Sequence, residues 1–158
     1  MRHTFAVLVE NHPGVLSKVA GLFARRGFNI ESLVVSETED SSASRMTIVV
    51  EGDTRVLEQV GKQLNKLVDI IKVTDITNEE TVDRQLCLIR VQTTDIDNRQ
   101  EIMQITEVFR CHVVDISPKS LIVEATGDEG KIQAIIRALK PFGIAELVRT
   151  GKVAMVRG

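Results

Sequence analysis

The residues best suited to chemistry lie in one run near the start of the chain, Glu10-Asn11-His12-Pro13-Gly14-Val15-Leu16-Ser17. This run follows an apolar segment and opens a stretch with helical spacing. We therefore expect the amides of Gly14, Val15 and Leu16 to lie at a helix start. Unpaired N–H groups and the positive end of the helix dipole attract anions there. Gly14 has no side chain and lets a ligand approach closely. The chemistry indicated is the binding of a carboxylate.

A second polar turn, around Asn29, follows the predicted helix and complements the first. The side-chain amides of Asn11 and Asn29 can bind either an ammonium or a carboxylate. An apolar wall is expected from Leu16, Ile30 and Val35. Two or three charge-assisted hydrogen bonds of roughly 1.5–3 kcal/mol each would give micromolar to millimolar affinity. The two turns together predict a site for a free amino acid. On spacing alone, an ordinary turn and a helix stop remain the alternative.

No set of residues is spaced for catalysis or metal binding. His12 could act as a base, but no serine, cysteine or carboxylate is placed by the sequence to work with it. His3 and His112 are isolated and lack the spacing of zinc ligands. We expect three solvated histidines, no catalytic residue and no metal. Cys87 and Cys111 are expected to be reduced packing residues rather than a disulfide.

The composition is typical of a soluble globular protein. The 158 residues are 43% hydrophobic and 27% charged, with a net charge of −2 at pH 7. Five Phe, no Trp and no Tyr leave the chain without the aromatic platforms of nucleic-acid-binding proteins, and the charge provides no basic surface. No apolar run approaches about 18 residues, and no signal pattern opens the chain. We expect a cytoplasmic protein that neither spans a membrane nor binds nucleic acid.

The elements that would position the two turns follow the order β-α-β-β-α-β within residues 1–77. Apolar runs and alternation predict the strands, whereas apolar residues at i, i+3, i+4 and i+7 predict the helices. The first helix should end at Gly27 in the left-handed conformation, and Asp53 should cap the second. The predicted strands are 4–10, 30–37, 46–50 and 70–77; the helices are 15–26 and a segment bearing Val56, Leu57, Val60 and Leu64.

The same order recurs in residues 84–158, after a polar linker at 78–83. Asp128 should start the last helix of this repeat, which ends near Pro141. The other predicted elements are strands 86–93, 113–117, 121–126, 144–148 and 153–156 and helix 98–109. We therefore predict an α+β protein of two tandem ferredoxin-like βαββαβ domains, each with its helices on one face of a four-stranded sheet. Because domains this small bury only about 60% of their unfolded surface, we expect a homodimer or partner sheet to cover the open face.

Three segments of the first half together resemble a known family. They are residues 10–17, Arg26-Gly27-Phe28-Asn29-Ile30-Glu31-Ser32-Leu33 and Ser44-Arg45-Met46-Thr47-Ile48-Val49. Their order is similar to the ACT domain of the small regulatory subunit of acetolactate synthase, also called acetohydroxyacid synthase. The similarity continues through Phe109-Arg110, Val114-Asp115-Ile116-Ser117, Thr126-Gly127, Arg149-Thr150-Gly151 and Arg157-Gly158. It covers essentially the whole chain, so residues 1–77 are expected to be an ACT domain.

The resemblance implies a protein with no catalysis of its own. Such small subunits activate a catalytic large subunit, which carries thiamine diphosphate, FAD and Mg²⁺, and confer feedback inhibition by valine in branched-chain amino-acid biosynthesis. In the family, the effector lies between the ACT domains of a dimer. Carried over to this sequence, the effector-binding residues are Asn11, Gly14, Val15 and Leu16 from one domain and Asn29 and Ile30 from the other. His12, Pro13 and Val35 are given supporting roles.

Two points stay open on the sequence alone. One methylene in an apolar pocket is worth only about 1–3 kcal/mol, so leucine and isoleucine remain alternatives to valine as the effector. A stand-alone amino-acid sensor or transcriptional regulator on the same fold is the alternative function. The sequence shows neither the basic surface nor the helix-turn-helix that a regulator of transcription would need.

Overall fold

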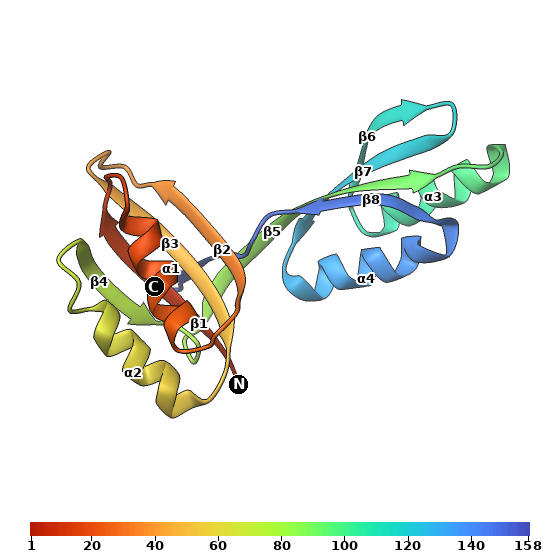
Figure 1. The fold of residues 1–158 in the computed structure, drawn as a ribbon. Helices are drawn as coiled ribbons and strands as arrows, with labels where there is room; N and C mark the ends of the chain where they lie inside the picture. Colours follow the sequence, from red (N-terminus) through yellow and green to blue (C-terminus); the bar gives the residue numbers. More distant parts are fainter. The chain divides into compact units, whose positions relative to one another are not determined.

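A computed structural model describes all residues from Met1 to Gly158. The chain divides into two compact units, residues 1–82 with 152–158 and residues 83–151. Each unit carries two helices on an antiparallel sheet, which has four strands in the first unit and, with the last strand of the chain added to its path of four, five in the second (Figure 1). The predicted α+β fold of two βαββαβ units is therefore confirmed.

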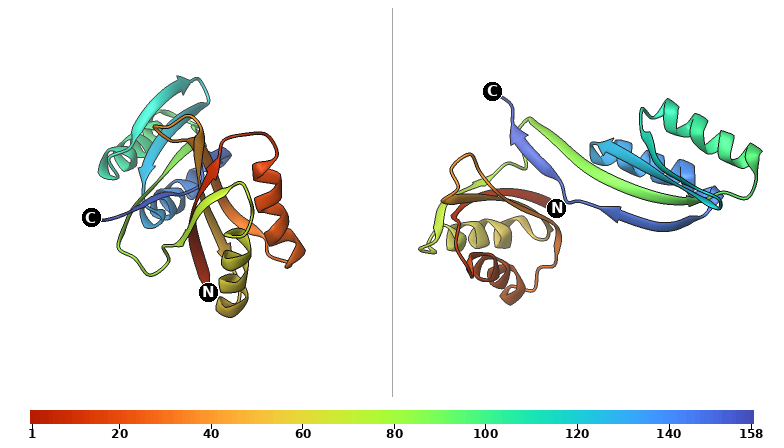
Figure 2. Two further views of the ribbon diagram at one scale, coloured as in Figure 1. Left: turned by 90° about the vertical axis from the view of Figure 1, so that its left-hand side faces the viewer. Right: turned by 90° about the horizontal axis from the view of Figure 1, so that it is seen from above.

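The first unit has the strand order β2-β3-β1-β4. Its elements are β1 (Arg2–Glu10), α1 (Val15–Arg25), β2 (Ile30–Glu37), β3 (Ala43–Glu51), α2 (Thr54–Leu64) and β4 (Ile70–Asp75). Both helices lie on the same face of the sheet (Figure 2). Their apolar stripes bury Phe23 and Leu57 against Phe5 and Ile48 from the strands. This packing fixes the direction in which α1 leaves the end of β1.

The ends of the two helices follow the predicted signals. Gly27 has φ +78°, the left-handed conformation expected after α1. Asp53 caps α2, because its side-chain oxygen accepts hydrogen bonds from the amides of Arg55 at 2.9 Å and Val56 at 3.3 Å. These signals are local in the sequence, which is why the sequence predicts them.

The second unit repeats the plan with the strand order β6-β7-β5-β8. Its elements are β5 (Thr81–Gln92), α3 (Ile96–Val108), β6 (His112–Ser117), β7 (Ser120–Gly127), α4 (Glu129–Leu139), the 3₁₀ turn η1 (Lys140–Phe142) and β8 (Ile144–Arg149). Asp128 caps α4 as predicted, by accepting from the amide of Lys131 at 2.9 Å. Cys87 and Cys111 are buried free thiols, and burial raises the pKa of both.

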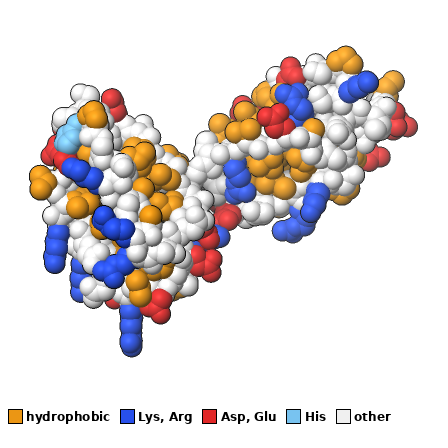
Figure 3. All heavy atoms as spheres, in the orientation of Figure 1, with side chains coloured by type: hydrophobic (Ala, Val, Ile, Leu, Met, Phe, Trp, Pro, Cys, Tyr) orange, Lys and Arg blue, Asp and Glu red, His pale blue; other side chains and the backbone are white.

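The open face of the second sheet, on the side away from α3 and α4, exposes apolar side chains. Leu86, Leu88 and Val148 are between 38% and 56% exposed. A loose ion pair lies among them, with Arg90 Nε 3.6 Å from a Glu146 carboxylate oxygen. Figure 3 shows apolar side chains gathered over this face with acidic and basic groups between them.

The two units divide differently from the expected domains 1–77 and 84–158. Residues 81–83, expected in the linker, begin β5, and the last strand, β9 (Val153–Val156), pairs with β5. Residues 152–158 belong to the first unit. The Lys152 amide donates to Ser32 Oγ at 2.9 Å, and Arg45 donates to the Ala154 carbonyl at 2.7 Å. These long-range bonds explain the difference.

This C-terminal segment lies on the face of the first sheet that the helices leave open. Lys152 Nζ donates to Thr4 Oγ1 at 3.0 Å. Thr4 and Arg45 alternate along their strands with the core residues Phe5 and Met46, so they point to the opposite face. The face expected to need a partner sheet is therefore covered in part by the chain's own last residues.

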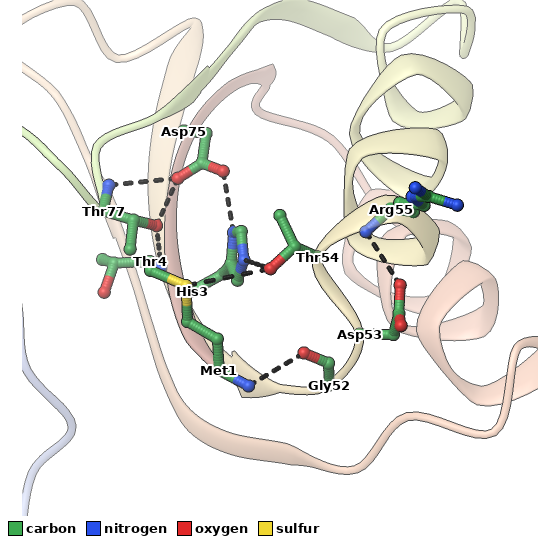
Figure 4. Close-up of polar contacts among 9 residues, drawn as sticks. All are labelled: Met1, His3, Thr4, Gly52, Asp53, Thr54, Arg55, Asp75 and Thr77. Carbon is green, nitrogen blue, oxygen red and sulfur yellow. Dashed lines mark hydrogen bonds and ion pairs between the residues drawn. The ribbon is translucent and has the colours of Figure 1, made fainter.

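His3 differs from the solvated histidine that the sequence predicts. It is only 3% exposed, its Nδ1 lies 2.9 Å from a carboxylate oxygen of Asp75, and its Nε2 lies 3.4 Å from Thr54 Oγ1. The Asp75 carboxylate also accepts from the amide and hydroxyl of Thr77, whose oxygen accepts from the Thr4 amide (Figure 4). Burial works to raise the pKa of Asp75, but the hydrogen bonds from Thr77 and His3 outweigh it and hold that pKa below its usual value.

Removing residues 152–158 should destabilise the first unit selectively, because its sheet face loses both cover and hydrogen bonds. We expect the first unit to lose about 1–3 kcal/mol of stability, since each net hydrogen bond is worth about 0.5–1.5 kcal/mol. Hydrogen exchange should show faster exchange in β2 and β3 and unchanged exchange in β6 and β7. Deletion of the exposed Gly158 alone is the control. Equally faster hydrogen exchange in both units would contradict the assignment of residues 152–158 to the first unit.

Asp75→Asn should change the acid sensitivity of the fold. The folded-state pKa of Asp75 lies below the unfolded value of about 3.9, so the carboxylate stabilises the fold above that value and its contribution is lost as pH falls through the folded-state pKa. The variant should unfold at lower temperature near neutral pH and lose less further stability on acidification. Thermal unfolding followed by circular dichroism from about pH 7 to pH 3 measures both effects. The control is Glu39→Gln, at an exposed carboxylate; a wild-type acid profile in Asp75→Asn would refute the role.

Candidate binding site at the start of the first helix

Asn11 anchors the turn between β1 and α1. Its amide donates to the Ser42 carbonyl at 2.8 Å. Its side-chain Nδ2 donates to the Ser41 carbonyl at 2.9 Å and to a Glu37 carboxylate oxygen at 3.2 Å. The donor group of this predicted ligand is thus engaged in holding the loop between β2 and β3, and the side-chain oxygen is the atom left for a ligand.

The first turn of α1 has no cap. Gly14 occupies the N-cap position with φ +88° and ψ −12°, and no side chain accepts a hydrogen bond from the helix start. The first intrahelical bond runs from the Lys18 amide to the Gly14 carbonyl at 3.1 Å. The amides of Val15, Leu16 and Ser17 therefore have no side-chain acceptor. This is the donor arrangement that binds anions at helix starts.

The apolar residues near this turn differ in exposure. Val15 is 3% exposed and packs in the core, so only its backbone amide can face a ligand. Leu16 is 44% exposed on α1, and Val35 is 39% exposed near the end of β2. Pro13 is exposed in the turn itself. Leu16 and Val35 thus offer apolar surface at the end of the sheet where Gly14 lies.

The structure does not bring Ile30 to this wall, which corrects the sequence-based expectation. Val35 lies opposite Met46 on β3, whereas Ile30 lies opposite Val50. Four residues of strand separate these positions, roughly 13 Å at about 3.3 Å per residue. Ile30 packs against the core at the other end of the sheet.

The two predicted turns are likewise apart within one chain. Asn29 is exposed beyond the far end of α1 and makes no side-chain hydrogen bond. The 11 residues of α1 separate it from Gly14, about 16 Å at 1.5 Å per residue. The two turns of one chain therefore cannot both contact the same small amino acid. Contact with both requires a second copy, as the resemblance implied.

Asp69, between α2 and β4, is a residue of the turn that sequence reasoning missed. It is 8% exposed, and its carboxylate lies 3.0 Å from His12 Nε2 and 2.8 Å from Lys18 Nζ. The hydrogen bond from Lys18 outweighs burial and, with the charges of Lys18 and His12, holds the pKa of Asp69 below its usual value. His12, predicted to be solvated, is half exposed but paired. Asp69 lies more than fifty residues from Lys18 and His12 in the sequence, so no local sequence pattern predicts these contacts.

Other chemistry finds little support in the side-chain arrangement. No group of three or more His, Cys, Asp or Glu side chains is placed to hold a metal ion. His112, the remaining histidine, is exposed on β6. No helix has the length and apolar character needed to cross a membrane.

A βαββαβ unit with an uncapped helix start after its first strand, followed by a second such unit, is the arrangement expected of a protein built on an ACT domain. Residues 5–72 match the family model described as an AHAS small subunit-like ACT domain. Residues 84–158 match the model described as the small subunit of acetolactate synthase. The chain belongs to the family of acetolactate synthase small subunits. It is a regulatory subunit, and catalysis resides in the large subunit of that enzyme.

Individual relatives match over nearly their whole length. The chain is 61% identical over 158 residues to a probable acetolactate synthase small subunit from Archaeoglobus fulgidus, covering 100% of this chain and 98% of the relative. It is 52% identical over 156 residues to the small subunit from Mycobacterium bovis, covering 99% and 92%. The crystal structure of the Thermotoga maritima small subunit matches with a TM-score of 0.90 and 44% identity, covering 100% of this chain and 98% of that one.

The left-handed conformation of Gly14 yields a prediction for stability. A Cβ at Gly14 would meet no atom within 4 Å, so Gly14→Ala acts through backbone strain alone. We expect a loss of about 1–2 kcal/mol of unfolding free energy. Gly21→Ala, at an equally open position inside α1, is the matched control and should gain about 0.5–1 kcal/mol. Chemical denaturation measures both. A neutral Gly14→Ala would show that this conformation is not required.

Proposed function

We propose that this chain activates the catalytic large subunit of acetolactate synthase and confers feedback inhibition by valine in branched-chain amino-acid biosynthesis. Membership of the small-subunit family supports the large subunit as partner. The observation that carries the effector site is the uncapped start of α1, where the amides of Val15, Leu16 and Ser17 have no side-chain acceptor. These amides would bind the valine carboxylate.

The remaining contacts are assigned across a homodimer of ACT domains. Gly14 allows close approach, Leu16 and Val35 offer apolar surface, and the Asn11 side-chain oxygen is an acceptor for the ammonium group. Asn29 and Ile30 of a second copy would complete the site. The separation of the two turns within one chain supports this arrangement, because a single copy offers only half of the contacts.

Inhibition then follows from differential affinity. A ligand that joins two ACT domains stabilises one dimer arrangement over another, and it can shift the equilibrium only by the difference in its affinity for the two. Couplings of this kind are typically about 1–3 kcal/mol. Valine binding would thereby favour the arrangement that activates the large subunit less.

The second unit is proposed to contact the large subunit. Its open sheet face exposes Leu86, Leu88 and Val148 around the Arg90–Glu146 pair, which provides apolar and charged groups for a protein partner. Thiamine diphosphate, Mg²⁺ and FAD are assigned to the large subunit, and no cofactor is assigned to this chain. The complex is proposed to work in the cytoplasm, where a biosynthetic enzyme meets its substrates.

Calorimetry of the full chain, alone and with the large subunit, tests the effector site. Valine should bind saturably in the micromolar-to-millimolar range, with alanine weaker and leucine as the test of pocket size. Asn29→Ala should abolish valine binding and valine inhibition while leaving activation of the large subunit intact. Asn65→Ala, which removes an exposed amide outside both turns, is the matched control.

Three outcomes separate the alternatives. Loss of activation together with valine binding in Asn29→Ala would mean that the turn holds the fold rather than the ligand. Valine binding without any effect on the large subunit would favour a stand-alone amino-acid sensor. Absence of valine binding in the wild type, both alone and with the large subunit, would refute the proposed effector site.

A further inference from the structure

The nearly buried carboxylate of Asp69 holds the turn that precedes α1 in place. Both oxygens of Asp69 are engaged, one with His12 Nε2 at 3.0 Å and the other with Lys18 Nζ at 2.8 Å. The Asp69 carbonyl also accepts from the Glu10 amide at 2.8 Å. Asp69 therefore contacts the last residue of β1, the turn, and the second turn of α1.

These contacts set the charge around the uncapped amides. The first turn of α1 contains no acidic residue, and the side chains of His12 before it and Lys18 after it both contact Asp69. A free lysine beside a helix start would bind any carboxylate, because its full charge adds to the partial charges of the amides. Here the Lys18 ammonium is directed to Asp69, with 60% of its side chain exposed and 11% of the Asp69 side chain exposed.

We propose that Asp69 is a positioning and specificity-determining residue of the effector site: it fixes the turn and makes the site select a zwitterionic amino acid over a simple carboxylate. This inference rests on the proposed effector site at the same turn. Asp69 withdraws Lys18 and His12 from the ligand, so the carboxylate of the ligand is bound by backbone amides. The negative charge of Asp69 also favours a ligand that brings its own ammonium group.

Two substitutions should shift this preference in opposite directions. Asp69→Asn leaves the Lys18 ammonium without its counter-charge, so simple carboxylates should gain relative to amino acids. Lys18→Met leaves the Asp69 charge less compensated, so simple carboxylates should lose relative to amino acids. If these residues only stabilised the fold, their substitution would weaken the binding of amino acids and of simple carboxylates by the same factor.

The test compares valine with isovalerate, which has the same side chain and carboxylate but lacks the ammonium group. Calorimetry on the full chain, in the state in which the wild type binds valine, gives the ratio of the two dissociation constants. We expect the preference for valine to fall about tenfold in Asp69→Asn and to rise severalfold in Lys18→Met, the size expected when one charge-assisted contact is changed. The controls are Asp83→Asn and Lys119→Met, which make the same charge changes at residues of the second unit.

Each outcome decides the inference. Opposite shifts of the ratio support it, and Lys18→Met alone tests the direction if Asp69→Asn does not fold, because Lys18 is largely exposed. An unchanged ratio in variants that still fold overturns the inference and leaves the proposed function standing. Absence of valine binding in the wild type overturns the proposed effector site and this inference with it.

Discussion

The proposed site of the first unit depends on the amides at the start of α1, which no side chain caps. Backbone N–H groups at a helix start need an acceptor, usually a side chain at the N-cap. Gly14 cannot supply one, and its left-handed conformation directs the chain into the helix without placing another residue there. Asn11 ties the turn to the β2–β3 loop, and Asp69 ties it to α2 and β4. The side chains around the turn thus hold it in place without capping the start of α1.

The topology explains why the proposed site needs a second copy of the chain. In a βαββαβ unit, α1 returns antiparallel to β1, so the turn before α1 and the turn after it lie at opposite ends of the sheet. Gly14 and Asn29 are therefore separated by the whole helix. A small ligand that uses both turns must join two chains, and its binding is then linked to dimerisation by mass action. A site of this kind can regulate without any catalytic group.

The sequence predicts the local part of this structure well. Helix starts at Asp53 and Asp128 and the helix stop at Gly27 are encoded within a few residues, and the structure has each of them. Periodicity also predicts the strands, because alternation places their apolar residues on the core face. The helix start at Val15 is also local, since it depends on the turn residues directly before it.

The features that the sequence did not predict are those made by residues far apart. His3 is read as isolated until β4 places Asp75 beside it, 72 residues later. His12 is expected to be solvated, but the fold places Asp69 beside it, far along the sequence. Ile30 was grouped with Leu16 and Val35 because periodicity gives the face of a strand but not the position along the sheet, which depends on strand pairing.

The path of the chain also determines which fragments can carry the site. Thr47 and Val49 are buried on the face of β3 opposite the helices, beside the segment anchored through Lys152 and Ala154. A fragment ending near residue 77 would contain every predicted effector residue, yet it would expose this face to water. Loss of apolar cover costs about 25 cal/mol per Å² of surface exposed, and small domains have little stability to spare. A fragment designed to retain valine binding should therefore join strands β1 to β4 to residues 152–158, because the end of the chain belongs to the same folded unit as its beginning.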